Sequence, residues 1–462
     1  MSGFYGRDFD DAGNMIGAAD PLPDEPVTEL GYARRLIHVY GSQLRYVHAW
    51  RRWLVWDGQR WAADSTGQAA RWTKSIARLV TADAIAIADD KKRLAAENLA
   101  RRGESSAGVS GALALAGTEQ EVVVTPGDLD ADPWLINCAN GTLDLRTGDL
   151  RAHSREDLLT KLAAGAFDPE ASGKTFERFL TEVQPDQGMR DYLRRLTGHG
   201  LVGEVIEHVL PIHCGEGANG KSTFFGVVSA ALGDYAAPAD PSLLTARGYD
   251  AHPTGTADLF GLRLAIVHET DQGRQLAEGT VKRLTGGDPI KARRMREDFW
   301  SFRPSHTFAM LTNHKPAVSG TDEGIWRRLR LIPWGVVIPE SQRDEELGNK
   351  LSLELDYVLT WLVRGCIDWR AEGLAEPKQV TDATSGYRGE SDAIGRFLGE
   401  RTMSQGQIRS SELYQAYAKW CADEGAEPVT QTAFSVELAK RGYAKKSAAT
   451  GNFWTGLGLS SE

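Results

Sequence analysis

Residues 208–233 read HVLPIHCGEGANGKSTFFGVVSAALG, an apolar run, a glycine-rich loop and an apolar helical stretch in direct succession. The loop contains the pattern G-x-x-x-x-G-K-[ST], with glycines at Gly215 and Gly220, followed by Lys221 and Ser222. Glycines at this spacing let backbone N–H groups turn toward phosphate oxygens, and the start of the following helix adds a positive dipole. The lysine of such a loop reaches the β- and γ-phosphates, and the hydroxyl binds Mg²⁺.

The surroundings of the pattern decide whether it is a chance match. Glycine makes up 49 of the 462 residues, so chance is the competing explanation. A strand before the loop and a helix after it are the context that a phosphate loop requires, and they favour a site for ATP and Mg²⁺. The residues predicted to contact the nucleotide are Gly215, Gly217, Asn219, Gly220, Lys221, Ser222 and Thr223.

A nucleotide site of this class also needs a carboxylate at the end of a neighbouring strand, where it orients Mg²⁺ and polarises water. Residues 262–271, LRLAIVHETD, form an apolar run that ends in acids. Glu269 falls at the carboxyl end of this predicted strand, where α/β sheets bind ligands, and Asp271 is the second candidate. The predicted metal ligands are therefore Ser222, Glu269 and Asp271. Solvated loop acids are the alternative interpretation.

Two further motifs follow downstream. Residues 306–316, HTFAMLTNHKP, predict a strand that ends at the polar Asn313, which could hold the attacking water or sense the γ-phosphate. Residues 322–334, DEGIWRRLRLIPW, place Arg327 and Arg328 before another apolar strand. One of these arginines could reach the nucleotide of a neighbouring subunit, although a structural ion pair is the commoner role of an arginine.

The ordered set GEGANGKS, AIVHETD, VKRLTGGDPIKARRM, TFAMLTNHKP and DEGIWRRLRLIPW resembles superfamily three helicases. More closely, it is similar to the helicase half of phage and plasmid primases, which is related to the poxvirus primase-helicase. The resemblance implies an α/β fold, namely an AAA+ type P-loop core with a parallel sheet. It also implies that the chain assembles as a homo-oligomeric ring, a hexamer in this family, with ATP bound between subunits. The resemblance spans about residues 130–375, including the helical and small-β helper region before the core, and it extends more loosely to the tryptophan-rich N-terminus and the winged helix.

The resemblance also implies roles for single residues. Lys221 and Ser222 match the Walker A pair, Glu269 the Walker B acid and Asn313 sensor one, and Arg327 or Arg328 would be the arginine finger. The sequence departs from the family at two points. Walker B has one acid at its core position, with Asp271 two residues on, so the division of labour between the two carboxylates stays open. The paired arginines leave the finger ambiguous.

Basic residues gather between Walker B and Asn313, within VKRLTGGDPIKARRMREDFWSF at 281–302. In the family this region forms a helix and then a hairpin that projects into the ring channel. Basic side chains there would bind backbone phosphates without reading sequence, as a translocating motor requires. A solvated face compensated by Glu297 and Asp298 is the alternative. The predicted DNA contacts are Lys282, Lys291, Arg293, Arg294 and Arg296.

The composition excludes several protein classes. There are 53 basic and 63 acidic residues, giving a net charge of -10, so contacts with nucleic acid must be local rather than global. The 4 cysteines lie far apart without a C-x-x-C pair, which excludes a zinc ribbon and fits a reducing cytoplasm. No apolar window reaches the roughly 18 residues of a membrane span, and no signal peptide is present. We expect a cytoplasmic protein encoded by a phage or mobile element in a bacterial host.

The predicted organisation has six segments. Residues 1–28 form a flexible lead-in, 29–125 an N-terminal accessory domain, 126–205 a small β-meander with a helical helper, 206–375 the ATPase domain, 376–393 a linker and 394–462 a winged helix. Asp57-Gly58 predicts a hairpin within 46–61, whose tryptophans Trp50, Trp53, Trp56 and Trp61 would build a small core. The Gly/Ser-rich stretch 103–117 predicts a connection or a helix break.

These features predict an ATP-dependent DNA helicase of phage, prophage or plasmid replication. It would act as a ring on single-stranded or forked DNA, with a primase, polymerase or loader as a further partner. A bifunctional primase-helicase is the first alternative. Against it, the chain before residue 125 is short for a primase domain, and Asp128, Asp130 and Asp132 resemble loop acids more than a metal pair. The second alternative is an origin-binding module that ATP switches between assembly states, with specific duplex binding through residues 394–458.

Overall fold

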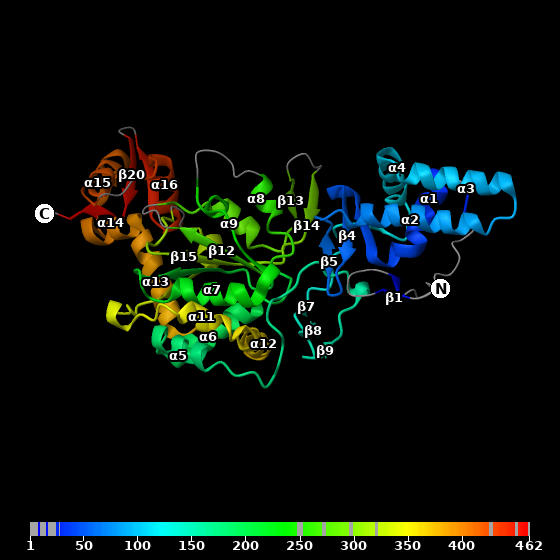
Figure 1. The fold of residues 1–462 in the computed structure, drawn as a ribbon. Coiled ribbons are helices and arrows are strands. Elements are labelled where there is room, and N and C mark those ends of the chain that lie inside the picture. Colours follow the sequence, from blue (N-terminus) through cyan, green and yellow to red (C-terminus); the bar gives the residue numbers. More distant parts are fainter. Residues whose placement is uncertain are drawn as a thin grey trace.

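The computed structural model describes residues 8–9, 15–16, 25–26, 28–246, 253–269, 274–294, 299–318, 322–424, 428–448 and 451–460. The chain is elongated, with N-terminal helices at one end, a C-terminal group of helices and strands at the other, and a large sheet between them (Figure 1). Among the described helices, none has both the length and the apolar character that crossing a membrane requires.

The central sheet is parallel throughout. Its strand order is β11-β12-β15-β10-β16, so β10 lies between β15 and β16 although both come later in the sequence. The strands are β10 (Leu210–Cys214), β11 (Ala236–Pro238), β12 (Leu264–Glu269), β15 (Thr307–Thr312) and β16 (Leu329–Pro333). The prediction of an α/β protein with a parallel sheet is confirmed.

Both faces of this sheet are covered. Leu264 and Ile266 of β12 pack into one cluster of buried side chains, and the alternate residues Ala265 and Val267 pack into another. Two covered faces explain why these strands read as continuous apolar runs. The first face carries α5 (Lys174–Val183), α6 (Gln187–His199), α7 (Lys221–Leu232), α11 (Leu347–Ser352) and α12 (Leu355–Glu372). The second carries α8 (Pro253–Ala257), α9 (Glu278–Leu284), α10 (Glu323–Trp326) and the hairpin β13 (Ile290–Ala292) with β14 (Trp300–Phe302).

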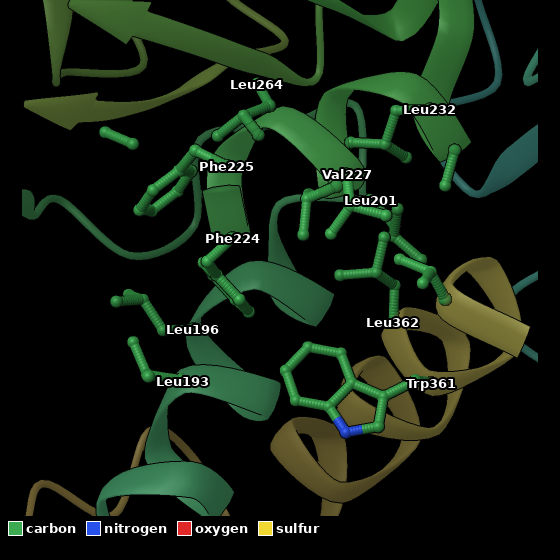
Figure 2. Close-up of a cluster of buried hydrophobic side chains, with 14 of the residues drawn as sticks. Leu193, Leu196, Leu201, Phe224, Phe225, Val227, Leu232, Leu264, Trp361 and Leu362 are labelled. Carbon is green, nitrogen blue, oxygen red and sulfur yellow. The ribbon is translucent and has the colours of Figure 1, made fainter. Parts of the chain in front are cut away.

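Helix α7 is fixed by the core beneath it (Figure 2). Phe224 of α7 meets Trp361 of α12 edge to face, with ring centroids 6.0 Å apart, and Leu193 and Leu196 of α6 lie beside them. Aromatic contacts of this geometry add to the hydrophobic stabilisation of the buried rings. The start of α7, where the glycine-rich loop ends, therefore has a rigid support.

The N-terminal region combines four helices with a four-stranded sheet of order β5-β4-β3-β6. Its elements are α1 (Glu29–Tyr40), α2 (Gln68–Ile85), α3 (Asp90–Gly103), α4 (Ser106–Ala116), β3 (Leu44–Val47), β4 (Arg52–Trp56), β5 (Trp61–Ala63) and β6 (Val123–Val124). The turn at Asp57-Gly58 does join two antiparallel strands, as predicted. Within the expected lead-in, β1 (Asp8–Phe9) pairs with β2 (Met15–Ile16).

One prediction for this region holds only in part, and another is wrong. Helix α3 ends at Gly103 and α4 begins at Ser106, so the predicted helix break is present at 104–105. The rest of the Gly/Ser-rich stretch 103–117 is mostly helix α4, because Ser105 caps it and Val109, Ala112 and Ala116 are buried. The tryptophans do not share one core. Trp53 packs against the N-terminal helices, whereas Trp50 lies edge-on against Phe260 and Trp300 of the region around the central sheet, at centroid distances of 5.3 and 5.8 Å. Tertiary contacts, which no local pattern encodes, decide both outcomes.

The predicted β-meander is present. Strands β7 (Leu135–Cys138), β8 (Gly141–Asp144) and β9 (Leu150–Arg151) form an antiparallel sheet in sequence order, with Asn140-Gly141 at the first turn.

Residues 376–393, expected as a linker, contain helix α13 (Lys378–Ser391), which packs on the region around the central sheet. Lys315 pairs with Glu390 at 2.6 Å, the Tyr387 hydroxyl donates to the Pro316 carbonyl, and Arg388 pairs with Glu323. The Leu331 amide of β16 donates to the Thr384 hydroxyl at 2.9 Å. The polar composition therefore reflects side-chain contacts rather than an irregular connection.

The C-terminal region is a compact group of three helices and short strands with its own buried cluster. Its elements are α14 (Ala393–Arg401), β17 (Thr402–Met403), β18 (Gln407–Arg409), α15 (Ser410–Asp423), α16 (Gln431–Lys440), β19 (Ala444–Ala448), β20 (Gly451–Thr455) and β21 (Gly458–Leu459). Strands β18, β20 and β19 form an antiparallel sheet in that spatial order.

Candidate phosphate-binding site

The glycine-rich loop connects the end of β10 to the start of α7, as the sequence predicts. Gly220 adopts a left-handed conformation with φ of 82°. A Cβ at Gly220 would lie 2.4 Å from Val183 Cγ1, and one at Gly215 would lie 2.3 Å from the Trp334 carbonyl oxygen. Both positions therefore require glycine, for conformation at one and for space at both.

The Lys221 side chain folds into the loop. Lys221 is only 5% exposed, and its Nζ donates a hydrogen bond of 2.5 Å to the Gly215 carbonyl. Burial lowers the pKa of Lys221 from its usual value. Ser222 is exposed at the first turn of α7 and Thr223 is half-buried. A buried cation, an exposed hydroxyl and a helix N-terminus thus lie within three consecutive residues, which is an arrangement suited to an anionic group.

Asn219 braces the loop from within. Its side-chain amide donates to the carbonyls of Glu216 at 2.5 Å and Trp334 at 3.2 Å, and its Oδ1 accepts from the Lys221 amide at 3.3 Å. Asn219 is buried, so the structure gives it a role in holding the loop rather than an open surface for a ligand.

The sheet brings the ends of three strands together. Thr312, the last residue of β15, is paired in register with Cys214 of β10 on one side and with Glu269 of β12 on the other. The Gly215 amide donates to the Thr312 carbonyl at 3.3 Å, and the exposed Asn313 follows directly. Lys221, Glu269 and Asn313 therefore converge on the carboxyl edge of the sheet, as predicted. The Glu269 side chain and all of Asp271 lie outside the described residues.

Arg327 and Arg328 lie at the opposite edge. They precede β16, and the Leu210 amide at the start of β10 donates to the Arg328 carbonyl at 2.7 Å. Arg328 is buried, with Nη1 donating to the Gly324 carbonyl at 2.7 Å, and burial lowers the pKa of Arg328. Arg327 is exposed, and no hydrogen bond or ion pair engages its side chain within the described chain. Neither arginine can join its own loop, because a five-residue strand of about 16 Å separates them.

A hollow of about 600 Å³ opens beside the loop. Its walls come from the loop, from one face of α5 and from the segment after β16; among the lining residues are Arg178, Glu182, Gly220, Thr223, Ile338 and Arg343. No motif marks α5 or the segment around 338–347 as part of the site, because both reach the loop only through the tertiary fold.

The predicted DNA contacts divide into two places. Lys291, Arg293 and Arg294 lie together on the β13–β14 hairpin and just after β13. Lys282 is on α9 instead, where it pairs with Asp322, the residue that caps α10. Arg296 lies outside the described residues.

The three acids of the DLDAD stretch each have a separate partner. Asp128 accepts from Thr125, Asp130 accepts from Thr160, and Asp132 pairs with Arg146 at 2.5 Å. These contacts agree with the interpretation that they are loop acids.

Three family models match the chain in order. The model described as D5 N terminal like matches residues 33–185, a family of unknown function matches 213–328, and the model described as Poxvirus D5 protein-like matches 389–454.

Curated relatives are proteins of large DNA viruses. The candidate helicase L207/L206 of Acanthamoeba polyphaga mimivirus is 28% identical over 320 residues, covering 63% of this chain and 33% of the relative. The candidate helicase 022R of Frog virus 3 is 25% identical, covering 52% and 27%. The candidate primase C962R of African swine fever virus is 25% identical, covering 63% and 34%. The chain thus spans about a third of the length of the curated relatives it matches.

Among solved structures, the C-terminal region of NrS-1 is similar at 12% identity with a TM-score of 0.41, covering 68% of this chain and 88% of that chain.

Proposed function

We propose that this chain, a relative of the D5-type helicases and primases of large DNA viruses, is an ATP-driven DNA helicase that moves along single-stranded DNA as a ring. The resemblance that the motifs predicted is confirmed by the D5-type family matches and by the viral relatives. The ATPase, the ring and the movement on DNA are our inference from the site.

The observation that carries the proposal is the loop between β10 and α7. Gly220 turns the loop in the left-handed conformation, Lys221 Nζ points into it, and a hollow beside it has room for a nucleoside. These features fit the triphosphate of ATP, whose hydrolysis would supply the free energy for movement. In this assignment the loop amides and Lys221 bind phosphate oxygens, Ser222 with Glu269 or Asp271 binds Mg²⁺, and Asn313 orients water.

The sheet supports an AAA+ type assignment. The strand that leads into the loop is flanked by the strand that ends before Asn313 and by the strand that follows the arginines. With the arginines one strand length from their own loop, a neighbouring copy would supply this charge, which favours a ring with ATP between subunits. The exposed Arg327 suits this role, whereas Arg328 is held by Gly324 within its own chain.

The motor reading predicts that Lys221→Ala abolishes both activities. We expect single-turnover unwinding of a forked DNA and DNA-stimulated ATP hydrolysis to fall by at least about a hundredfold, because the variant loses the cation that binds the phosphates. Lys91→Ala, on the exposed surface of α3, is the matched control and should retain wild-type rates. Mass photometry of the same samples reports ring assembly.

The alternatives give different results in this experiment. ATP-dependent assembly on duplex DNA without strand separation would contradict the motor and favour the switched binding module, in which residues 394–458 as a winged helix would hold the duplex. Template-dependent primer synthesis by the wild-type chain would establish the primase-helicase alternative.

A further inference from the structure

An aromatic side chain lies on the exposed face of the β13–β14 hairpin beside two cations. Phe299 directly precedes β14 and is 50% exposed. The Lys291 ammonium and the Arg293 guanidinium carbon each lie 4.7 Å from the centre of its ring. A single exposed apolar side chain is ordinary on a protein surface, but an exposed ring held against two positive charges is a specific arrangement.

The register of the hairpin explains why these three side chains share a face. Lys291 is paired with Ser301, and side chains alternate between faces along each strand. The inner face is buried in the core of the ATPase region, through Ile290, Ala292, Trp300 and Phe302. Trp300 is further anchored by Phe260 and by Trp50 from the N-terminal region. A rigid inner face therefore presents Lys291, Arg293 and Phe299 to solvent.

We infer that Phe299 stacks on a base of single-stranded nucleic acid while Lys291 and Arg293 bind the flanking phosphates; this deepens the proposed function and rests on it. Each nucleotide offers a flat aromatic base and one negative charge, which match an exposed ring beside cations. Every base has an aromatic face, so stacking tolerates any sequence, as a translocating motor requires. An apolar protein partner fits less well, because it would bury both cations without supplying a counter-charge of its own.

The test compares two strands that differ only in their bases. Fluorescence anisotropy of the full chain is measured on a labelled oligothymidylate and on an abasic strand of the same length and charge, across a salt series. Stacking on one ring predicts that Phe299→Leu weakens binding to oligothymidylate by roughly tenfold while leaving the abasic strand unaffected. Phe299→Tyr, which keeps the ring, should restore binding to within about twofold. Leu353→Ala, at an 87% exposed apolar residue elsewhere, is the matched control.

The salt series separates the contribution of the Phe299 side chain to binding from that of the two cations. Lys291→Gln should reduce the slope of log affinity against log salt by about one ion and weaken both strands alike, whereas Phe299→Leu should leave the slope unchanged. Equal weakening of both strands by Phe299→Leu, or no effect of it on either, would overturn the inference while the proposed function stands. Failure of the wild-type chain to bind either strand would overturn both.

Discussion

The two ends of the central sheet differ in what they offer a nucleotide. At the carboxyl end, the loop, the buried Lys221 and the exposed Asn313 surround one point, braced by Asn219. At the amino end, Arg327 is exposed and unengaged within the described chain, while Arg328 folds back onto Gly324. One end carries the groups that we propose bind phosphates, and the other carries an exposed cation one strand length from that loop.

This difference is the basis of our proposal that the nucleotide site is divided between copies. A single chain carries the groups that we propose bind the triphosphate, but the charge that would stabilise the transferring phosphoryl group lies one strand length away. Binding and hydrolysis should therefore depend on different parts of the molecule, and the assembly state should affect the second far more than the first.

The largest expected effect comes from mixing variants of the two ends. Lys221→Ala should reduce ATP hydrolysis by at least about a hundredfold. Arg327→Ala should reduce it by about a thousandfold or more, because finger arginines supply that much. In an equimolar mixture, about a quarter of the interfaces would combine an intact loop with an intact arginine from the neighbour. The rate of ATP hydrolysis should therefore return to about a quarter of the wild-type rate. The ATPase rate of the mixture is the measurement.

The outcome of this mixing also identifies the arginine. Complementation by Arg328→Ala instead of Arg327→Ala would show that the buried arginine moves out to become the finger. Absence of complementation by either variant, with rings confirmed by mass photometry, would contradict a site divided between copies, since each site would then be complete within one chain.

A smaller effect is expected from adding a methyl group to the loop. Gly220→Ala should lower the free energy of unfolding by about 3 kcal/mol, because it combines a left-handed alanine with a clash against Val183. Adding Val183→Ala removes the clash but not the backbone strain. The double variant should therefore bind ATP more tightly than the sum of the two single changes predicts. Urea unfolding and titration with a nucleotide analogue measure the two quantities. A Gly220→Ala variant with wild-type values of both would contradict the loop geometry.

The smallest effect concerns pH. Burial, with the charge of Lys221 as a second cause, lowers the pKa of His213 to about 3, and His213 Nδ1 accepts from Trp334 Nε1 at 3.2 Å. The pKa of His213 in the folded chain lies below its value in the unfolded chain. The contribution of neutral His213 to the free energy of unfolding is therefore complete above about pH 6.5 and is lost as the pH falls toward 3. Between pH 7.5 and 5.0 the wild type should lose about 2 kcal/mol more than His213→Phe, measured by urea unfolding. If the wild type and His213→Phe lost equal free energy of unfolding, the pKa of His213 would not be lowered, and the histidine beneath the loop would be charged at pH 5.0.

The sequence predicts best what is contiguous. The loop from Gly215 to Ser222 and the strands that end at Glu269 and Thr312 follow from short patterns, because spacing and apolar runs are local properties. The same reasoning could not find Val183 against Gly220, or the Asn219 contact with Trp334, since these join segments far apart in the chain. It also left the choice between the arginines open, and the burial of Arg328 is a tertiary fact.

Composition predicts the wrong secondary structure where tertiary contacts stabilise a helix that the residues of the segment do not favour. Helix α4 forms in a stretch rich in glycine and serine because Ala112 and Ala116 pack into the N-terminal core and supply the stabilisation that propensity lacks. Helix α13 contains few apolar residues, but Val380 and Tyr387 are fully buried and their neighbours pair with the ATPase region.

Helix α13 has a mechanical consequence. A polar stretch between two folded regions is ordinarily where a protease cuts, yet contacts at Thr384, Tyr387 and Glu390 hold this one against the loop after β15 and against β16. At the end of α13, Asp392 caps α14 and pairs with Arg441 at 2.6 Å. A continuous series of contacts therefore connects the loop after β15, through α13, to the C-terminal region. A displacement of the loop after Asn313 would be expected to reach the C-terminal region through this helix.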